Sequence, residues 1–133
     1  ILHVVDGVPS IPELRIAALF HDIGKPYVYK EDENGVGHFF GHWDKSNEIF
    51  SKYADRYSLD ENSKGLISNL ILYHDVNIDK LDNELKEIIT IFDKKGIKML
   101  FKLKKSDLQA QNKKFHYLLE TYSKQESELL KLK

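Results

Sequence analysis

The chain has 133 residues, of which 41% are hydrophobic and 31% are charged, and this suits one globular domain with a substantial core. No apolar run approaches the roughly 18 residues of a membrane span, and no signal segment opens the chain, so we expect a cytoplasmic protein without membrane contact. The absence of cysteine excludes disulfides and thiolate metal sites. Any metal would therefore be held by His, Asp or Glu, a ligand set that favours Mn, Fe, Mg, Co, Ni or Zn.

The chain begins at Ile1 rather than at Met, and we therefore expect it to be a piece of a longer protein or to lack its native start. The net charge is −1, but acidic residues outnumber basic residues over 1–79, and the reverse holds over 80–133. The lysine-rich second half could lie near phosphate, or it could simply form a solvated face. The sequence leaves both interpretations open.

Helix and turn signals alternate along the chain. Ser10 and Glu13 have the spacing of a capping box, and the helix that starts there is predicted to end around Gly24 and Pro26. Turn residues predict a loop over 24–41, in which residues 36–40 could form a short strand or hairpin arm. Periodic apolar residues predict further helices over about 42–57, 60–74, 81–94, 97–111 and 114–130.

This order of elements predicts an all-α orthogonal helical bundle of about six helices with little or no strand, in a single domain over residues 1–133. Gly96 is predicted to separate the helix over 81–94 from the helix over 97–111. Trp43, Tyr53 and Tyr57 are expected in the core rather than as platforms for stacked bases.

Four acidic or imidazole side chains lie on or beside the apolar stripes of the predicted helices: His21, Asp22, His74 and Asp107. Any one of them alone would be explained by a hydrogen-bonded core histidine, a helix cap or a buried ion pair. The only arginines are Arg15 and Arg56, and neither is well placed to pair with both aspartates. Two histidines and two aspartates that converge from three helices are better explained by a metal ion. An Asp beside a His can bridge two ions, and such a site activates water and clamps phosphoryl oxygens.

The segment over residues 17–26, AALFHDIGKP, resembles the signature of the HD superfamily of metal-dependent phosphohydrolases. Within that superfamily, residues 35–42 and 106–111 resemble the HD domain of bacterial tRNA nucleotidyltransferases and poly(A) polymerase-like proteins. The likeness covers about residues 1–112 and leaves 113–133 as a C-terminal helix. The chain lacks the Gly-Tyr-Pro triplet of the cyclic-di-nucleotide phosphodiesterase branch, and Lys25-Pro26 stands where the alarmone hydrolases usually carry an acidic pair.

The resemblance implies roles for particular residues. His21, Asp22 and Asp107 would be metal ligands. His42 and His74 would bind a second metal or the substrate phosphate. Lys25 would hold a phosphate oxygen or simply pair with Asp22. The catalytic residues would be Asp22, Lys25, His42 and His74. The family's first metal ligand, a histidine, would lie immediately before Ile1, with His3 as the alternative. His38 and His116 are expected to have no metal role, although His38 could approach the mouth of the site.

The resemblance implies a metal-dependent phosphohydrolase that acts on a phosphomonoester or a cyclic phosphodiester of a nucleotide or an RNA end. The alternative is a non-catalytic structural or RNA-positioning domain with a vestigial metal site, which would contact tRNA through the parent protein. The divalent metal itself, Mn, Ni, Mg, Fe, Co or Zn, is not identified by the sequence. The oligomeric state stays open as well.

Overall fold

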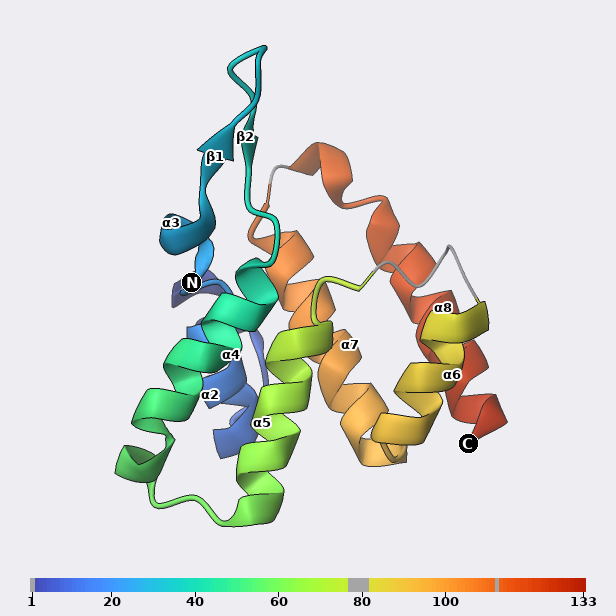
Figure 1. Ribbon diagram of the computed structural model, residues 1–133. Coiled ribbons are helices and arrows are strands. Elements are labelled where there is room, and N and C mark those ends of the chain that lie inside the picture. Colours follow the sequence, from blue (N-terminus) through green and yellow to red (C-terminus); the bar gives the residue numbers. More distant parts are fainter. Residues whose placement is uncertain (1, 77–81, 112) are drawn as a thin grey trace.

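The computed structural model describes residues 2–76, 82–111 and 113–133 and confirms an all-α bundle with one small β-hairpin (Figure 1). In chain order the elements are α1 (Leu2–Gly7), α2 (Pro12–Phe20), α3 (Lys25–Val28), β1 (Lys30–Glu31), β2 (Gly37–His38), α4 (His42–Tyr53), a 3₁₀ helix (Ala54–Tyr57), α5 (Glu61–Tyr73), α6 (Asp82–Ile91), α7 (Lys94–Gln109), a second 3₁₀ helix (Lys113–Phe115) and α8 (Leu118–Leu132). In the described ranges, every helix is too short or too polar to span a lipid bilayer.

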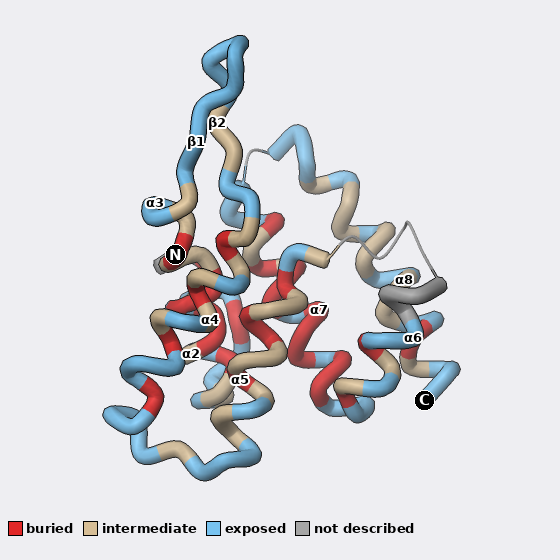
Figure 2. The backbone as a smooth tube through the Cα atoms, in the orientation of Figure 1, coloured by how far each residue is buried: buried red, intermediate tan, exposed pale blue. Residues whose placement is uncertain are grey.

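The core lies where α2, α4, α5 and α7 face one another (Figure 2). The apolar stripes predicted for α2, α5 and α7 are buried. The fully buried members of these stripes are Leu14, Ala17, Ala18, Ile67, Leu70, Ile71, Leu100 and Leu103. Burying each large aliphatic side chain contributes about 1.5–3 kcal/mol, so these stripes fix the relative positions of the three helices. Helix α8 packs against α7 on the other side of the bundle, and α6 packs against α8.

The predicted capping box at the start of α2 is wrong. Ile11, not Ser10, occupies the N-cap position, and its side chain makes no capping hydrogen bond. Pro12 follows as the first helical residue, where its missing N–H leaves one donor fewer to satisfy. The Glu13 carboxylate accepts a hydrogen bond from the Ser63 hydroxyl at 3.1 Å. This contact ties α2 to α5.

The helix break predicted at Gly96 is wrong, because Gly96 lies within α7. Helix α6 ends at Ile91, and Asp93 then caps α7 by accepting a hydrogen bond from the Gly96 N–H at 2.7 Å. Gly96 therefore lies inside the first turn of α7, because a capping aspartate satisfies the backbone donor three residues on. The start of the preceding predicted helix, at residue 81, lies outside the described residues.

The predicted loop over 24–41 contains α3 and the hairpin, which projects from the bundle (Figure 1). Lys30 pairs with His38 and Glu31 with Gly37 in an antiparallel register. The short strand expected within residues 36–40 is therefore present as β2. The Asp32 carboxylate closes the turn by accepting hydrogen bonds from two backbone N–H groups, those of residues 34 and 36.

Candidate metal centre

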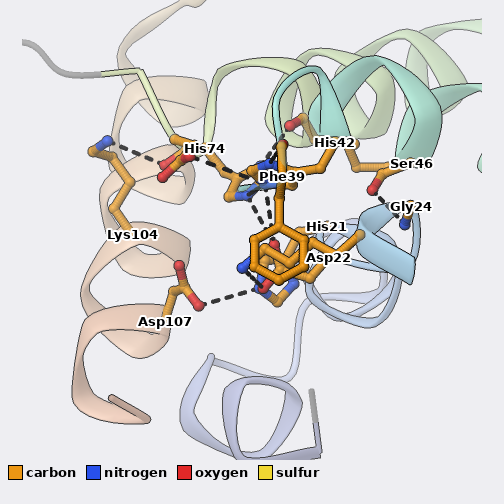
Figure 3. A network of polar contacts seen from close by, with 12 residues as sticks. His21, Asp22, Gly24, Phe39, His42, Ser46, His74, Lys104 and Asp107 are labelled. Carbon is orange, nitrogen blue, oxygen red and sulfur yellow. Dashed lines mark hydrogen bonds and ion pairs between the residues drawn. The ribbon is translucent and has the colours of Figure 1, made fainter. Parts of the chain in front are cut away.

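The polar residues singled out in the sequence come together at one end of the core (Figure 3). His21 and Asp22 follow α2 directly, and the His21 N–H still bonds to the Ala17 carbonyl as a continuation of that helix. His42 is the first residue of α4, and His74 is the C-cap of α5. Asp107 lies in the last turn of α7. Four helices therefore each present one end, or the last turn, to the same small volume.

Asp22 lies in the middle of this group. Its Oδ2 is 3.1 Å from His21 Nε2 and 3.3 Å from Lys25 Nζ. Its Oδ1 is 3.3 Å from His42 Nε2 and 3.4 Å from His74 Nε2. The two oxygens of one carboxylate thus face two different sets of nitrogens, which is the arrangement that a bridging ligand requires.

All three histidines are oriented by the backbone. The Nδ1 atoms of His21, His42 and His74 lie 2.5, 3.1 and 2.6 Å from the carbonyl oxygens of Ala18, Phe39 and Ile71, respectively. A carbonyl can only accept, so each Nδ1 carries a proton and each Nε2 is the ring nitrogen that faces the cluster. A backbone partner on the far nitrogen is the usual support of a metal-binding histidine, because it fixes both the tautomer and the ring.

The group has the chemistry of a divalent-metal site. One ligand atom from each of His21, Asp22 and His74 can be chosen so that all lie within 4.8 Å of one another. Asp107 adds an oxygen 3.3 Å from His21 Nε2. Asp22 Oδ1 is buried and has no hydrogen-bond partner among the described residues, although an unpaired buried acceptor is costly. Imidazole nitrogens and carboxylate oxygens suit the borderline and hard divalent ions, and a cation would satisfy this oxygen.

The charges in the centre shift the pKa values of two residues. Burial lowers the pKa of His21, but its contacts with Asp107 and Asp22 outweigh this effect and raise the pKa to about 9. Burial likewise works against ionisation of Asp22, yet its contact with protonated His21 holds its pKa well below the usual range. Without metal, therefore, a proton on His21 balances the carboxylates at neutral pH, and a metal ion must displace that proton.

Lys25 pairs with Asp22 at 3.3 Å, which is one of the two roles that the sequence left open, and its side chain is 37% exposed. Its role with phosphate stays a prediction. His38 lines a cavity that His42 also lines, so it does approach the centre. His116 lies between the second 3₁₀ helix and α8 and is not among the residues that could share a metal ion with His21 and Asp22. The side chain of His3 falls outside the described residues.

Several supporting residues were not recognised from the sequence. Ser46 is fully buried, and its hydroxyl accepts a hydrogen bond from the Gly24 N–H at 2.9 Å. Lys104 is 5% exposed and donates to the carbonyls of His74 and Val76 at 3.1 and 2.8 Å. Lys104 thus ties the end of α5 to α7, one turn before Asp107 (Figure 3). The sequence signal for Lys104 was hidden, because this lysine lies among many exposed ones.

The aromatic residues expected in the core behave differently from one another. Trp43 is half-buried, whereas Tyr53 and Tyr57 are 41% and 37% exposed. The expectation is therefore wrong for the two tyrosines. Tyr53 packs under the guanidinium of Arg56, and Tyr57 meets Phe20 edge-on. Both lie at the far end of α4 from the metal-binding group.

Imidazoles and carboxylates thus converge at the helix ends of an all-α bundle, which defines a helical domain with a candidate metal site. The comparison with known families gives a match to the HD domain over residues 10–96, more than half of the chain, so the chain belongs to the HD domain family. This family comprises metal-dependent phosphohydrolases, and its members bind divalent metals. The match includes His21, Asp22, His42 and His74 and ends before Asp107. No curated protein and no solved structure matches the chain significantly.

Proposed function

We propose that this protein hydrolyses a phosphomonoester or a cyclic phosphodiester of a nucleotide or an RNA end, using divalent metal. The observation that carries the proposal is the set of three imidazole Nε2 atoms aimed at the two oxygens of Asp22. A purely structural core would not aim the Nε2 atoms of both His42 and His74 at one carboxylate oxygen, because each buried acceptor then lacks a donor.

The residues divide into two groups around Asp22. His21, Asp22 and Asp107 would hold one metal ion, and Asp22, His42 and His74 would hold a second one or contact the substrate phosphate. When bound, a divalent ion supplies a Lewis acid and lowers the pKa of a water towards about 7. Lys25, whose ammonium is partly exposed beside Asp22, would bind a phosphate oxygen.

The direct experiment is hydrolysis of adenosine 2′,3′-cyclic phosphate and of AMP by the full natural chain with added Mn²⁺, Ni²⁺ or Mg²⁺. We expect metal-dependent turnover that is lost in Asp22→Ala and in Asp107→Ala. Asp55→Ala is the matched control, because that carboxylate is exposed and pairs only with Lys64 among the contacts that we describe. Absence of turnover with every metal, in a protein that is folded and metal-loaded, would contradict the proposal.

A second candidate is a non-catalytic domain that positions RNA in a cytoplasmic tRNA nucleotidyltransferase-like protein. Exposed lysines on α7 favour it, because cations on one helix can contact several phosphates. Those lysines are Lys94, Lys95, Lys98 and Lys102. Salt-dependent tRNA binding without any hydrolysis would support this candidate over the first one.

A further inference from the structure

A cavity of about 420 Å³ opens beside the metal-binding group, at the base of the hairpin. Its walls include Lys25 and His42 from the metal centre, and Phe39 and Phe40 from the hairpin. The volume lies within the usual range of small-molecule sites, roughly 300–1,000 Å³. Two residues of the metal centre therefore form part of the cavity wall, and two phenyl rings form another part of it.

The aromatic part of the wall is unusually exposed. Phe40 is 76% exposed and Phe39 is 38% exposed. Single exposed apolar residues are common on protein surfaces, but here two adjacent phenyl rings line one cavity. A planar aromatic ligand would bury them.

The ring of Phe40 is held in place from one side. His38 stacks on it with an interplanar angle of 9° and a centroid separation of 5.0 Å. His38 Nε2 is in turn 2.9 Å from Asp32 Oδ2, and Asp32 closes the hairpin turn through its other oxygen. Since His38 covers one face of the phenyl ring, a ligand can stack on the opposite face with little loss of side-chain entropy.

The aromatic part of the wall is connected directly to the metal-binding group. The Lys25 ammonium lies 3.3 Å from Asp22 Oδ2 and 5.4 Å from the centroid of the Phe39 ring. The Phe39 carbonyl accepts the Nδ1–H of His42. A phosphate at Lys25 would thus lie next to the ring of Phe39, and a group attached to that phosphate would extend along the hairpin wall.

We propose that Phe40, supported by His38 and Asp32, is a stacking subsite for the base of a nucleotide whose phosphate binds at Lys25 and the metal centre. This subsite makes the protein selective for phosphoesters that carry a nucleobase over those that carry only a sugar. The inference rests on the phosphohydrolase function proposed above and names the specificity element of that same site.

The experiment compares AMP with ribose 5-phosphate, which keeps the sugar and phosphate but has no base. Trp43 is the only tryptophan of the chain and lines the cavity, so its fluorescence reports occupancy. Both probes are titrated into the full chain in excess Mg²⁺. Because stacking of a base on an aromatic side chain contributes about 1–3 kcal/mol, we expect AMP to bind about 5- to 140-fold more tightly than ribose 5-phosphate.

Phe40→Ala should remove most of this preference and leave the affinity for ribose 5-phosphate unchanged, whereas Phe40→Trp should keep the preference. Tyr53→Ala, which removes an exposed aromatic ring at the far end of α4, should change neither affinity. Equal binding of the two probes by the natural protein, or an equal loss for both in Phe40→Ala, would overturn the subsite. Failure of ribose 5-phosphate itself to bind the metal-loaded protein would instead overturn the phosphate site, and with it the subsite.

Discussion

The Nε2 atoms of His42 and His74 face each other at a distance of 3.3 Å in the buried centre of the protein. Each ring already directs its Nδ1 at a backbone carbonyl. A neutral imidazole has one N–H, so a neutral ring with its proton on Nε2 would turn an Nδ1 lone pair towards a carbonyl oxygen. No choice of neutral tautomers satisfies both contacts. A cation placed between these nitrogens and Asp22 Oδ1 removes the conflict, and for this reason we regard the centre as built for metal.

Replacing His42 should therefore weaken metal binding directly. We expect His42→Ala to lower the affinity for Mn²⁺ at least tenfold, measured by isothermal titration calorimetry, since it removes a ligand atom that faces Asp22 Oδ1. His116→Gln is the matched control, because His116 lies outside the centre. Equal affinity in the natural protein and in His42→Ala would exclude His42 as a ligand.

The stability of the metal-free protein should depend on pH through His21. The folded pKa of about 9 lies above the ordinary value of 6.5, so protonated His21 stabilises the fold. This contribution, about 3 kcal/mol for such a shift, is fully present below pH 6.5 and is lost as the pH rises through about 9.

Urea unfolding in EDTA should accordingly give a lower free energy of unfolding at pH 9.5 than at pH 6.5, and His21→Gln should flatten the dependence. Metal affinity should change in the opposite sense and rise over the same interval, because the ion competes with this proton. Stability that is constant or increases between these pH values would show that His21 is not protonated in the metal-free protein.

Gly24 should tolerate no side chain. A Cβ there would lie 2.6 Å from the Ser46 backbone nitrogen and 2.7 Å from the His42 carbonyl oxygen, closer than real contacts allow. Gly24→Ala must push α4 away from the turn after α2, and we expect a loss of about 1–3 kcal/mol together with weaker metal binding through His42. Gly65→Ala is the control, since its Cβ would meet nothing within 4 Å inside α5. The control should be neutral or stabilising by about 0.5–1 kcal/mol.

Lys104 should act on the centre without touching the metal. Lys104→Met keeps the bulk of the side chain but removes the donor to the carbonyls of His74 and Val76. We expect a loss of about 1–3 kcal/mol from these buried acceptors and a roughly tenfold weaker metal affinity as the end of α5 shifts. Lys102→Met, at an exposed position on the same helix, should change neither. A stability loss without any change in metal affinity would assign Lys104 to the fold alone.

Much of the fold and of the metal centre could be predicted from the sequence, because the patterns that indicate them are local. Periodic apolar residues predicted the buried faces of α2, α5 and α7, and histidines and aspartates on those faces indicated a polar centre. The segment around His21 and Asp22 resembles the HD signature, and the family match confirms that membership.

What the sequence could not supply depends on tertiary contacts. Ser10 looks like a helix cap because capping is judged from spacing, but Pro12 and the contact of Glu13 with Ser63 move the start of α2 by one residue. Lys104 looks like any other lysine of a solvated helix, and only the position of the end of α5 shows that it is buried. The stacked pair of His38 and Phe40 likewise depends on the register of the hairpin, which no local pattern specifies.

Metal binding by the full natural chain is the most direct test of the central claim. The measurement is elemental analysis of the purified protein, combined with calorimetric titration of Mn²⁺ into the natural protein and into Asp22→Asn. We predict a bound divalent ion in the natural protein and a loss of at least a hundredfold in affinity in the variant, because Asp22 contacts all three histidines. A natural protein that is folded and binds no divalent ion, or a variant that binds as tightly as the natural protein, would contradict the account.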